Sequence, residues 1–369
     1  MMGELALRYP REALVVSTGA YAGSAAFDAR VPQVVDRVGI RATRLRTVQG
    51  LALWTWRAGA LTRQWHPGFA WCAELKPAGY PARWVHARHG VPYGVIVHGT
   101  ELLLIQEKIR RSSFKRGTAG GIIGNAAVIV ANSNWTANVA LDVLTELDVV
   151  VPVETVPLGT TPSQFRPGVD TAAVRARYGL NGGPWLLTVA RLESHKGIDT
   201  VMKAMAAVRA VHPTVRYAVA GGGERLAALE QLRDQLGLGD AVRFLGVISD
   251  DELPALYNTA DLYVGASRRV EGLVEGFGIS LVEASASGLA VVGGRAGGVP
   301  DAVGDGETGM LVDPDDPAAV AAGINELLAN PERRKQLGAA GRKAVETYYN
   351  WDRVARDLME IDQRYRSTR

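Results

Sequence analysis

The chain has 369 residues and a mass of 39.4 kDa, which corresponds to two or three domains at about 150 residues per domain. Hydrophobic residues make up 47% and charged residues 21% of the sequence, and these values exclude a largely disordered chain. The single cysteine, Cys72, excludes an intramolecular disulfide and a cysteine-rich zinc site.

Short apolar runs alternate with longer helical patterns, as in βαβ units with a parallel sheet. Several of these runs are apolar throughout, as expected of strands that are covered on both faces. The clearest helical patterns lie at 226–237 and 316–337. The predicted strands lie at 13–18, 68–74, 93–99, 126–132 and 151–159 in the first half, and at 185–191, 215–223, 241–246, 261–267, 289–294 and 309–313 in the second.

A segment rich in Pro, Gly, Ser and Thr, residues 157–170, predicts a linker between the two halves. We therefore expect an α/β protein with two doubly wound parallel sheets. The predicted domains are 1–165 and 166–348, followed by a closing segment over 349–369. Ligands bind at the carboxyl ends of the strands in such sheets, so the site is expected in a cleft between the domains.

Charge is unevenly distributed along the chain. Residues 1–165 carry 17 Lys and Arg against 11 Asp and Glu, a net +6, and the remainder carries 24 against 27, a net −3. A basic first half suits an anionic partner. Residues 107–117 are either a surface for anionic lipid or a phosphorylated acceptor, or the solvated end of a helix. Their five cations are Lys108, Arg110, Arg111, Lys115 and Arg116.

Two glycines, Gly276 and Gly278, stand just before a helical apolar run, where backbone N–H groups can approach an anion. The carboxylates Glu275 and Glu283 flank this turn. The pattern indicates a diphosphate at the helix start with carboxylates on sugar hydroxyls. The alternative is a tight strand-to-helix turn with solvated glutamates.

Three further residues stand at the ends of predicted strands. Arg191 and Lys196 follow the strand at 185–191 and could neutralise a leaving pyrophosphate, although many such pairs are simply surface cations. His98 ends the strand at 93–99 and precedes Gly99. A single histidine is more often structural, but this position favours a role towards substrate.

The order and spacing of these motifs resemble the retaining glycosyltransferases of family 4, which have the GT-B fold. The resemblance covers most of the chain and includes a pair of glutamates separated by seven residues, Glu275 and Glu283. The other matching segments are 97–102, 128–137, 156–168, 190–199, 218–224, 242–264 and 296–316. The closing segment resembles the helix that crosses back to the N-terminal domain in that fold.

The resemblance implies a role for each matching residue. Arg191 and Lys196 would hold the donor diphosphate, Glu275 the hydroxyls of the donor sugar, and Glu283 the ribose. The backbone amides of Gly276, Phe277 and Gly278 would face sugar and phosphate. Val247 would contact the base, within a base pocket lined by 244–247, and His98 would face the donor sugar and the acceptor from across the cleft.

These roles imply a retaining transferase that moves a hexose, with mannose or glucose favoured, from a nucleotide-diphosphate sugar to a glycan, lipid-linked or glycolipid acceptor. Arg191, Lys196 and a helix N-terminus can stabilise the leaving diphosphate, so neither a metal nor a cofactor is expected. The alternatives are a nucleotide-sugar epimerase or hydrolase with the same fold, and an inactive remnant that binds nucleotide sugar. No nucleic-acid recognition module is found, so a nucleic-acid partner is not expected.

The start of the chain departs from the family pattern. Only twelve residues precede the first predicted strand, so the family's first strand and its Gly-rich loop are expected to be missing, through a misplaced start or a true truncation. This start has no signal-peptide pattern, and no apolar run is long enough to cross a membrane. We expect a cytoplasmic protein with peripheral contact to an anionic membrane surface.

Overall fold

In the computed structural model, which describes residues 2–366, the chain forms two compact units. The N-terminal unit contains residues up to Val156 and those from Trp351 onward, and the C-terminal unit spans Pro157–Asn350. The first boundary therefore lies before the linker and not at the predicted 165/166. The reason is that Phe165 is buried in the C-terminal unit, with its ring 5.7 Å from that of Tyr257.

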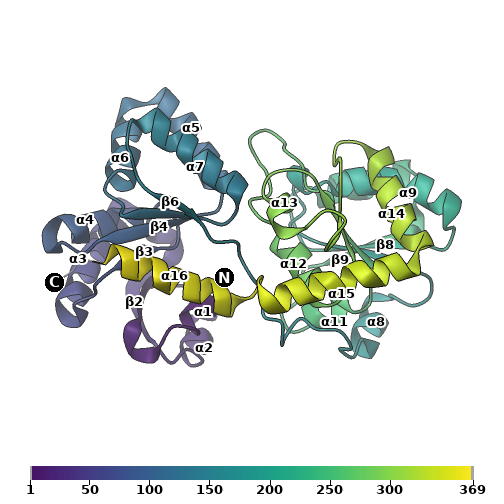
Figure 1. Ribbon diagram of the computed structural model, residues 1–369, viewed down its shortest axis with the longest axis horizontal. Coiled ribbons are helices and arrows are strands. Elements are labelled where there is room, and N and C mark those ends of the chain that lie inside the picture. The colour runs from purple at the N-terminus through teal and green to yellow at the C-terminus, as the bar shows by residue number, and fades with distance from the viewer. Residues whose placement is uncertain (1, 367–369) are drawn as a thin grey trace. The chain divides into compact units, whose positions relative to one another are not determined.

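The N-terminal unit contains two parallel sheets with helices around them (Figure 1). Strands β1 and β2 pair with each other, and the second sheet has the order β3-β4-β5-β6. Its elements are α1 (Met2–Ala6), η1 (Arg11–Ala13), β1 (Val15–Ala20), α2 (Ser24–Asp28), β2 (Val34–Arg41), η2 (Ala42–Arg44), α3 (Val48–Trp65), β3 (Ala70–Cys72), α4 (Gly79–His89), β4 (Tyr93–Val97), α5 (Thr100–Arg111), α6 (Ser113–Ile123), β5 (Val128–Ala131), α7 (Asn134–Leu147), β6 (Val153–Thr155) and α16 (Trp351–Tyr365).

The two sheets of this unit differ in burial. Every residue of β4 and β5 is buried. Alternate side chains pack against α5, α6 and α7 in one core, namely those of Tyr93, Val95, Val97, Ile129 and Ala131. Strand β2, which the sequence analysis missed, alternates between buried and more exposed positions and carries Asp36 and Arg37. Among residues 2–366, β1 and β3 are not paired with each other, so the unit has two sheets where one was expected.

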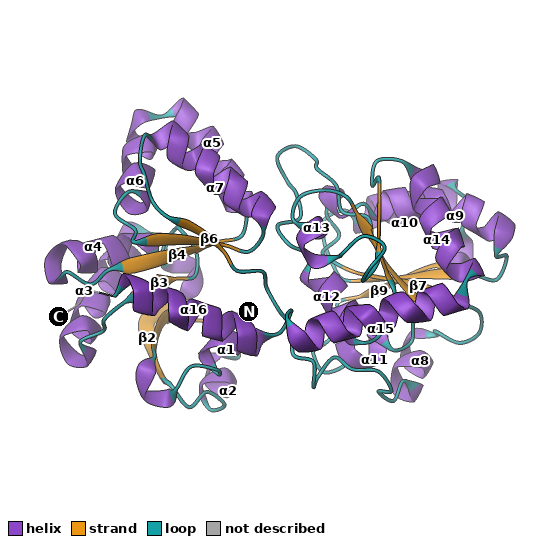
Figure 2. Ribbon diagram, in the orientation of Figure 1, coloured by secondary structure: helices purple, strands orange, loops and turns teal. Residues whose placement is uncertain are grey.

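The C-terminal unit is built on one six-stranded parallel sheet with the order β12-β11-β10-β7-β8-β9. Figure 2 shows the strands of this unit surrounded by helices. Its elements are α8 (Ala172–Tyr178), β7 (Trp185–Val189), η3 (Ser194–Lys196), α9 (Ile198–Val211), β8 (Arg216–Ala220), α10 (Leu226–Gln235), η4 (Gly239–Ala241), β9 (Val242–Gly246), α11 (Leu253–Tyr257), β10 (Leu262–Gly265), α12 (Ile279–Ala286), β11 (Val291–Gly294), α13 (Val299–Ala302), β12 (Met310–Val312), α14 (Pro317–Ala329) and α15 (Pro331–Thr347).

Alternate side chains of this sheet enter two separate cores. Leu186 of β7 packs in the core that includes α9 and α14, whereas its neighbours Trp185 and Leu187 pack in the core that includes α11 and α12. Successive side chains of a strand point to opposite faces, so an apolar run such as 185–189 is explained by helices on both faces.

All eleven strands predicted from the sequence are present. Ten are shorter than their predicted ranges, whereas β1 has the predicted length but lies two residues further along the chain. The predicted helix over 316–337 is two helices, because α14 ends at Ala329 and α15 begins at Pro331, with Asn330 as the cap residue between them. The Asn330 side chain accepts a hydrogen bond from the Arg333 N–H at 3.0 Å, and Pro331 occupies the first position of α15. No helix within the described residues is both long enough and apolar enough to span a bilayer.

Candidate functional site

Most of the residues singled out in the second half lie at one edge of the six-stranded sheet. The strands are parallel, so the loops after β7, β8, β10 and β11 begin at the same edge. Arg191 and Lys196 follow β7, and the segment with Glu275, Gly276 and Gly278 follows β10. This edge is the candidate site.

Lys196 and Glu275 form an ion pair at this edge. The Lys196 Nζ lies 2.5 Å from the Glu275 Oε2, and the Ser267 hydroxyl donates to the same oxygen at 3.4 Å. Both charged side chains are mostly buried, at 13% and 19% exposure. The adjacent Gly197 has φ +66°, and a Cβ there would meet the Ala266 carbonyl at 1.8 Å. The Lys196 turn is therefore pressed against the end of β10.

A second group of charges centres on Glu193. Arg191 donates to one Glu193 oxygen, and the His195 Nδ1 lies 3.5 Å from the other. Arg191 is largely exposed, whereas His195 is buried. Burial, followed by the charge of Lys196, lowers the pKa of His195, so the imidazole is neutral near pH 7. The structure thus brings both predicted cations close to carboxylates while keeping the histidine between them uncharged.

The turn before α12 presents backbone donors. Gly278 immediately precedes the helix with φ +99°, a conformation that suits glycine. The Phe277 side chain is buried in the core, 6.1 Å from the Tyr349 ring, and anchors the turn. Among residues 2–366, no acceptor bonds the N–H groups of Phe277 and Gly278. Amides at a helix N-terminus favour an anion.

Glu283 lies on α12 and is bonded to a buried tyrosine. The Tyr257 hydroxyl donates to the Glu283 Oε2 at 2.7 Å. Burial raises the pKa of Glu283 to about 7, against the lowering effect of the Tyr257 hydrogen bond. The two glutamates therefore differ, because Glu275 is paired with a cation and Glu283 with a neutral donor.

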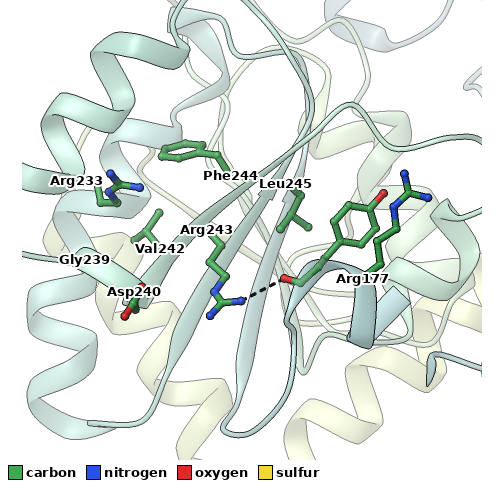
Figure 3. A pocket seen from close by; sticks show the side chains of 9 residues that line it. Arg177, Arg233, Gly239, Asp240, Val242, Arg243, Phe244 and Leu245 are labelled. Atoms are coloured by element: carbon green, nitrogen blue, oxygen red, sulfur yellow. Dashed lines mark hydrogen bonds between the residues drawn. The ribbon is translucent and has the colours of Figure 1, made fainter. Parts of the chain in front are cut away.

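Val247 protrudes from the loop after β9 and is 81% exposed. The preceding Phe244 and Leu245 line a pocket of about 580 Å³ along the edge strand β9 (Figure 3). Neither Lys196 nor Glu275 lines this pocket. The segment predicted to line one base pocket is thus divided, with Val247 on the surface and its neighbours in the β9 pocket.

Three arginines line the β9 pocket, and each already has a partner. Arg177 is paired with Glu252 and Arg233 with Asp234. Arg243 donates to the Gly179 carbonyl at 2.8 Å. Because these charges are satisfied within the unit, the pocket does not indicate an anion site, and the candidate site remains the edge with Lys196 and Glu275.

His98 belongs to the N-terminal unit, at the carboxyl end of β4. Its Nε2 lies 3.1 Å from the Ala73 carbonyl oxygen, and its backbone N–H donates to the Glu101 carboxylate. The side chain is half-buried. This geometry holds the ring at the end of the N-terminal sheet, where the sequence predicted it.

The basic stretch 107–117 forms the end of α5 and the start of α6. Arg110 and Arg111 are paired with Glu146 and Glu107, whereas no described carboxylate is paired with Lys108 or Lys115. Lys76 joins them from the loop after β3, with its Nζ 3.4 Å from the Thr118 hydroxyl. Burial, and then repulsion from the two other lysines, lowers the pKa of Lys76.

Four residues of the candidate site were missed from the sequence. Glu193 lies within the motif 190–199, and Ser267 is the last residue of the predicted strand at 261–267. Both positions could therefore have been recognised from the sequence as candidates for the site. Tyr257 and Tyr263 lie in the segment 242–264 and look like ordinary core aromatics. Their hydroxyl partners are distant in sequence, so no local pattern reveals them.

Residues 170–344 match the family described as Glycosyl transferases group 1. The chain carries a Glycosyl transferases group 1 domain. This domain includes every candidate residue of the C-terminal unit.

Two curated relatives illustrate the similarity. A GDP-mannose-dependent alpha-(1-6)-phosphatidylinositol monomannoside mannosyltransferase of Mycolicibacterium smegmatis is 38% identical over 212 residues, which cover 57% of this chain and 56% of that protein. A D-inositol 3-phosphate glycosyltransferase of Acidothermus cellulolyticus is 33% identical over 302 residues, which cover 77% of this chain and 64% of that protein. The chain thus spans little more than half the length of the first of these relatives.

Solved structures agree on the fold. Anabaena HepE in complex with UDP and glucose is 18% identical, with a TM-score of 0.78 over 98% of this chain and 94% of that chain. Sucrose-phosphate synthase from Thermosynechococcus elongatus is 24% identical, with a TM-score of 0.72 over 90% of this chain and 83% of that chain. The fold of the chain is GT-B, as predicted.

Proposed function

We propose that this chain is a retaining hexosyltransferase that moves mannose or glucose from a nucleotide-diphosphate sugar to a glycan or glycolipid acceptor. The observation that carries the proposal is the edge of the C-terminal sheet, where Lys196 and Glu275 form an ion pair. The amides of Phe277 and Gly278, which no acceptor bonds within the described part of the chain, follow Glu275 directly before α12. This edge offers cations and N–H donors to a diphosphate and a carboxylate to sugar hydroxyls. The family match supports the reaction class.

Cleavage of the sugar–phosphate bond develops negative charge on the diphosphate. Lys196 and Arg191 would neutralise that charge, and the amides before α12 would donate to the same oxygens. Glu275 would accept from hydroxyls of the donor sugar, and Glu283 from the ribose. In a front-face reaction the leaving phosphate takes the acceptor proton, so no protein nucleophile is needed. Metal independence is part of the proposal, because these residues supply the positive charge themselves.

Mannose and GDP are the favoured donor components, because the first relative is named as GDP-mannose-dependent. Two relatives are named for acceptors that contain phosphate, phosphatidylinositol monomannoside and D-inositol 3-phosphate. In this chain, Lys76, Lys108 and Lys115 form a group of cations without described ion pairs. These observations support an anionic acceptor for this chain and peripheral contact with an anionic membrane. A cytoplasmic location is part of the proposal.

The first test is calorimetric binding of GDP, UDP and ADP, each with EDTA and then with magnesium. We expect tight binding of one diphosphate, with GDP first, and no requirement for magnesium. The Lys196→Gln variant is expected to weaken that binding by more than about tenfold, since a charge-assisted contact is lost. Absence of binding to all three nucleotides would overturn the proposal.

The second test measures transfer from GDP-mannose and UDP-glucose to an extracted lipid fraction. Transfer with retained anomeric configuration supports the proposed reaction. Release of free sugar without an acceptor would instead indicate a hydrolase, and donor binding without either product would indicate an inactive nucleotide-sugar-binding protein.

A further inference from the structure

Two buried tyrosines contact the same face of α12. Tyr257 comes from α11 and Tyr263 from β10, with ring centroids 5.9 Å apart. The Tyr257 hydroxyl donates to Glu283, and the Tyr263 hydroxyl donates to the Ser280 Oγ at 2.8 Å. Ser280 and Glu283 are three residues apart on a helix and therefore lie on one face. Glu283 and Ser280 thus each accept a hydrogen bond from a different tyrosine hydroxyl.

The Tyr257 hydrogen bond uses only one of the two Glu283 oxygens. Within the described residues, Oε1 makes no hydrogen bond and no cation pairs with the carboxylate. Among the described side chains, Asp250 and Tyr263 also interact with it electrostatically. Arg342 of α15 reaches the end of α12, but it donates to the Ala286 carbonyl. Oε1 is therefore the oxygen available to a ligand.

We propose that Tyr257 is the positioning residue for Glu283, since its hydroxyl fixes Oε2 and leaves Oε1 to accept from the ribose diol of the nucleotide. This inference rests on the proposed function, because it assigns the nucleotide ribose to Glu283. The charge state of the carboxyl matters for a physical reason. With Oε2 occupied as an acceptor, a proton on the carboxyl must sit on Oε1, and that oxygen then turns from acceptor into donor.

Nucleotide binding is therefore coupled to ionisation of Glu283. Burial raises the pKa of this carboxyl to about 7, and the Tyr257 hydrogen bond opposes that rise. Affinity for a nucleoside diphosphate should thus increase as the pH rises through about 7. Without the tyrosine hydroxyl the carboxyl would ionise at higher pH, and the midpoint of the affinity profile would move upward.

The test compares GDP with 2′,3′-dideoxy-GDP, which lacks the ribose diol, for the wild type and two variants. In Tyr257→Phe we expect GDP to bind about tenfold more weakly at a pH near 7, and dideoxy-GDP to change by less than about twofold. Tyr263→Phe is the matched control, because it removes a buried hydroxyl that is bonded to Ser280. It should change the affinity for both ligands by the same factor.

Equal weakening of both ligands by Tyr257→Phe, or an unmoved pH midpoint, would overturn the inference and assign Tyr257 a purely structural role. If Tyr257→Phe does not fold, 3-fluorotyrosine placed at 257 supplies a stronger donor. It should lower the pH midpoint for GDP, and an unchanged midpoint again overturns the inference.

The proposed function and the proposed role of Tyr257 can be contradicted independently of each other. If the wild type binds no nucleoside diphosphate, the proposed function falls, and the role of Tyr257 is then read from the carbon-13 titration of the Glu283 carboxyl in the free protein. A midpoint that is unchanged by Tyr257→Phe would show that the hydroxyl does not control this carboxyl.

Discussion

Ionisation of the Glu283 side chain would affect folding and the proposed ligand binding in opposite directions. Its pKa of about 7 lies above the ordinary value of 4.5, so the folded protein holds its proton more tightly than the unfolded chain does. The stability from this group is complete below the unfolded pKa and is lost as the pH rises through the folded pKa. Binding of a ribose, by contrast, requires the ionised carboxylate that folding disfavours.

Replacement of Glu283 by Gln should therefore flatten part of the pH dependence of stability. The Gln side chain can still accept the Tyr257 hydrogen bond, but it does not ionise. We expect wild type to lose up to about 3 kcal/mol relative to Glu283→Gln between about pH 4 and about pH 8. Urea unfolding at both pH values measures this difference, and a constant difference would show that folding does not raise the pKa of Glu283.

In the proposed site, Glu193 would compete with a diphosphate for Arg191. It is bonded to Arg191 and lies close to His195, so a diphosphate must displace it from the guanidinium. Glu193→Gln should therefore tighten GDP binding by about threefold, a modest gain because Arg191 is largely exposed and well solvated. Calorimetry measures the change. Glu230→Gln, at an exposed position of α10, controls for net charge, and an equal gain in that variant would assign the effect to charge alone.

At the scale of the element, the turn that carries Lys196 depends on Gly197. Its positive φ favours glycine, and the nearby Ala266 carbonyl leaves no room for a Cβ. We expect Gly197→Ala to lower the free energy of unfolding by about 2–4 kcal/mol and to weaken GDP binding, because Lys196 is displaced with its turn.

Gly237 provides the matched control for this prediction. It has a similar φ of +63°, and a Cβ there would meet no atom within 4 Å. Gly237→Ala should therefore show only the cost of the backbone conformation, about 1 kcal/mol, with GDP affinity unchanged. Urea unfolding and calorimetry compare the two variants, and equal losses would show that the Ala266 contact is unimportant.

The strands of the C-terminal unit could be predicted from the sequence because helices bury them on both faces. Runs such as 185–189 are covered on both faces and read as continuous apolar strands. Strand β2 was missed because it alternates between buried and exposed positions and includes Asp36 and Arg37. The helix over 316–337 was predicted as continuous although Asn330 and Pro331 interrupt it, and capping at these two residues ends one helix and starts the next.

The candidate site was predictable only where the chemistry lies in a local motif. Lys196, Glu275 and Gly278 occur in such motifs, and the structure brings them to one sheet edge. The partner of Glu283 could not be foreseen, because Tyr257 lies on another helix and its hydroxyl direction depends on packing against Phe165 and Tyr263.

At the scale of the whole molecule, positive charge is concentrated in the first half of the sequence. Residues 1–165 have a net charge of +6 and contain Lys76, Lys108 and Lys115, whereas the rest of the chain has a net −3 and contains the Glycosyl transferases group 1 domain. The three lysines stand close enough for repulsion to lower the pKa of Lys76. Such a cluster is stabilised when an anion, such as a lipid phosphate, enters among the charges.

Reversal of these charges should therefore weaken binding to anionic membranes. We expect Lys108→Glu with Lys115→Glu to reduce binding to vesicles of phosphatidylglycerol and phosphatidylcholine by more than about tenfold, at roughly 1 kcal/mol for each lysine lost. Vesicle sedimentation at rising salt measures the effect, and added salt should weaken wild-type binding in the same direction. Lys335→Glu with Lys343→Glu, at exposed positions of α15, makes the same change in net charge outside the cluster. If that pair weakens binding equally, attraction depends on overall charge, and the lysines of α5 and α6 form no specific surface.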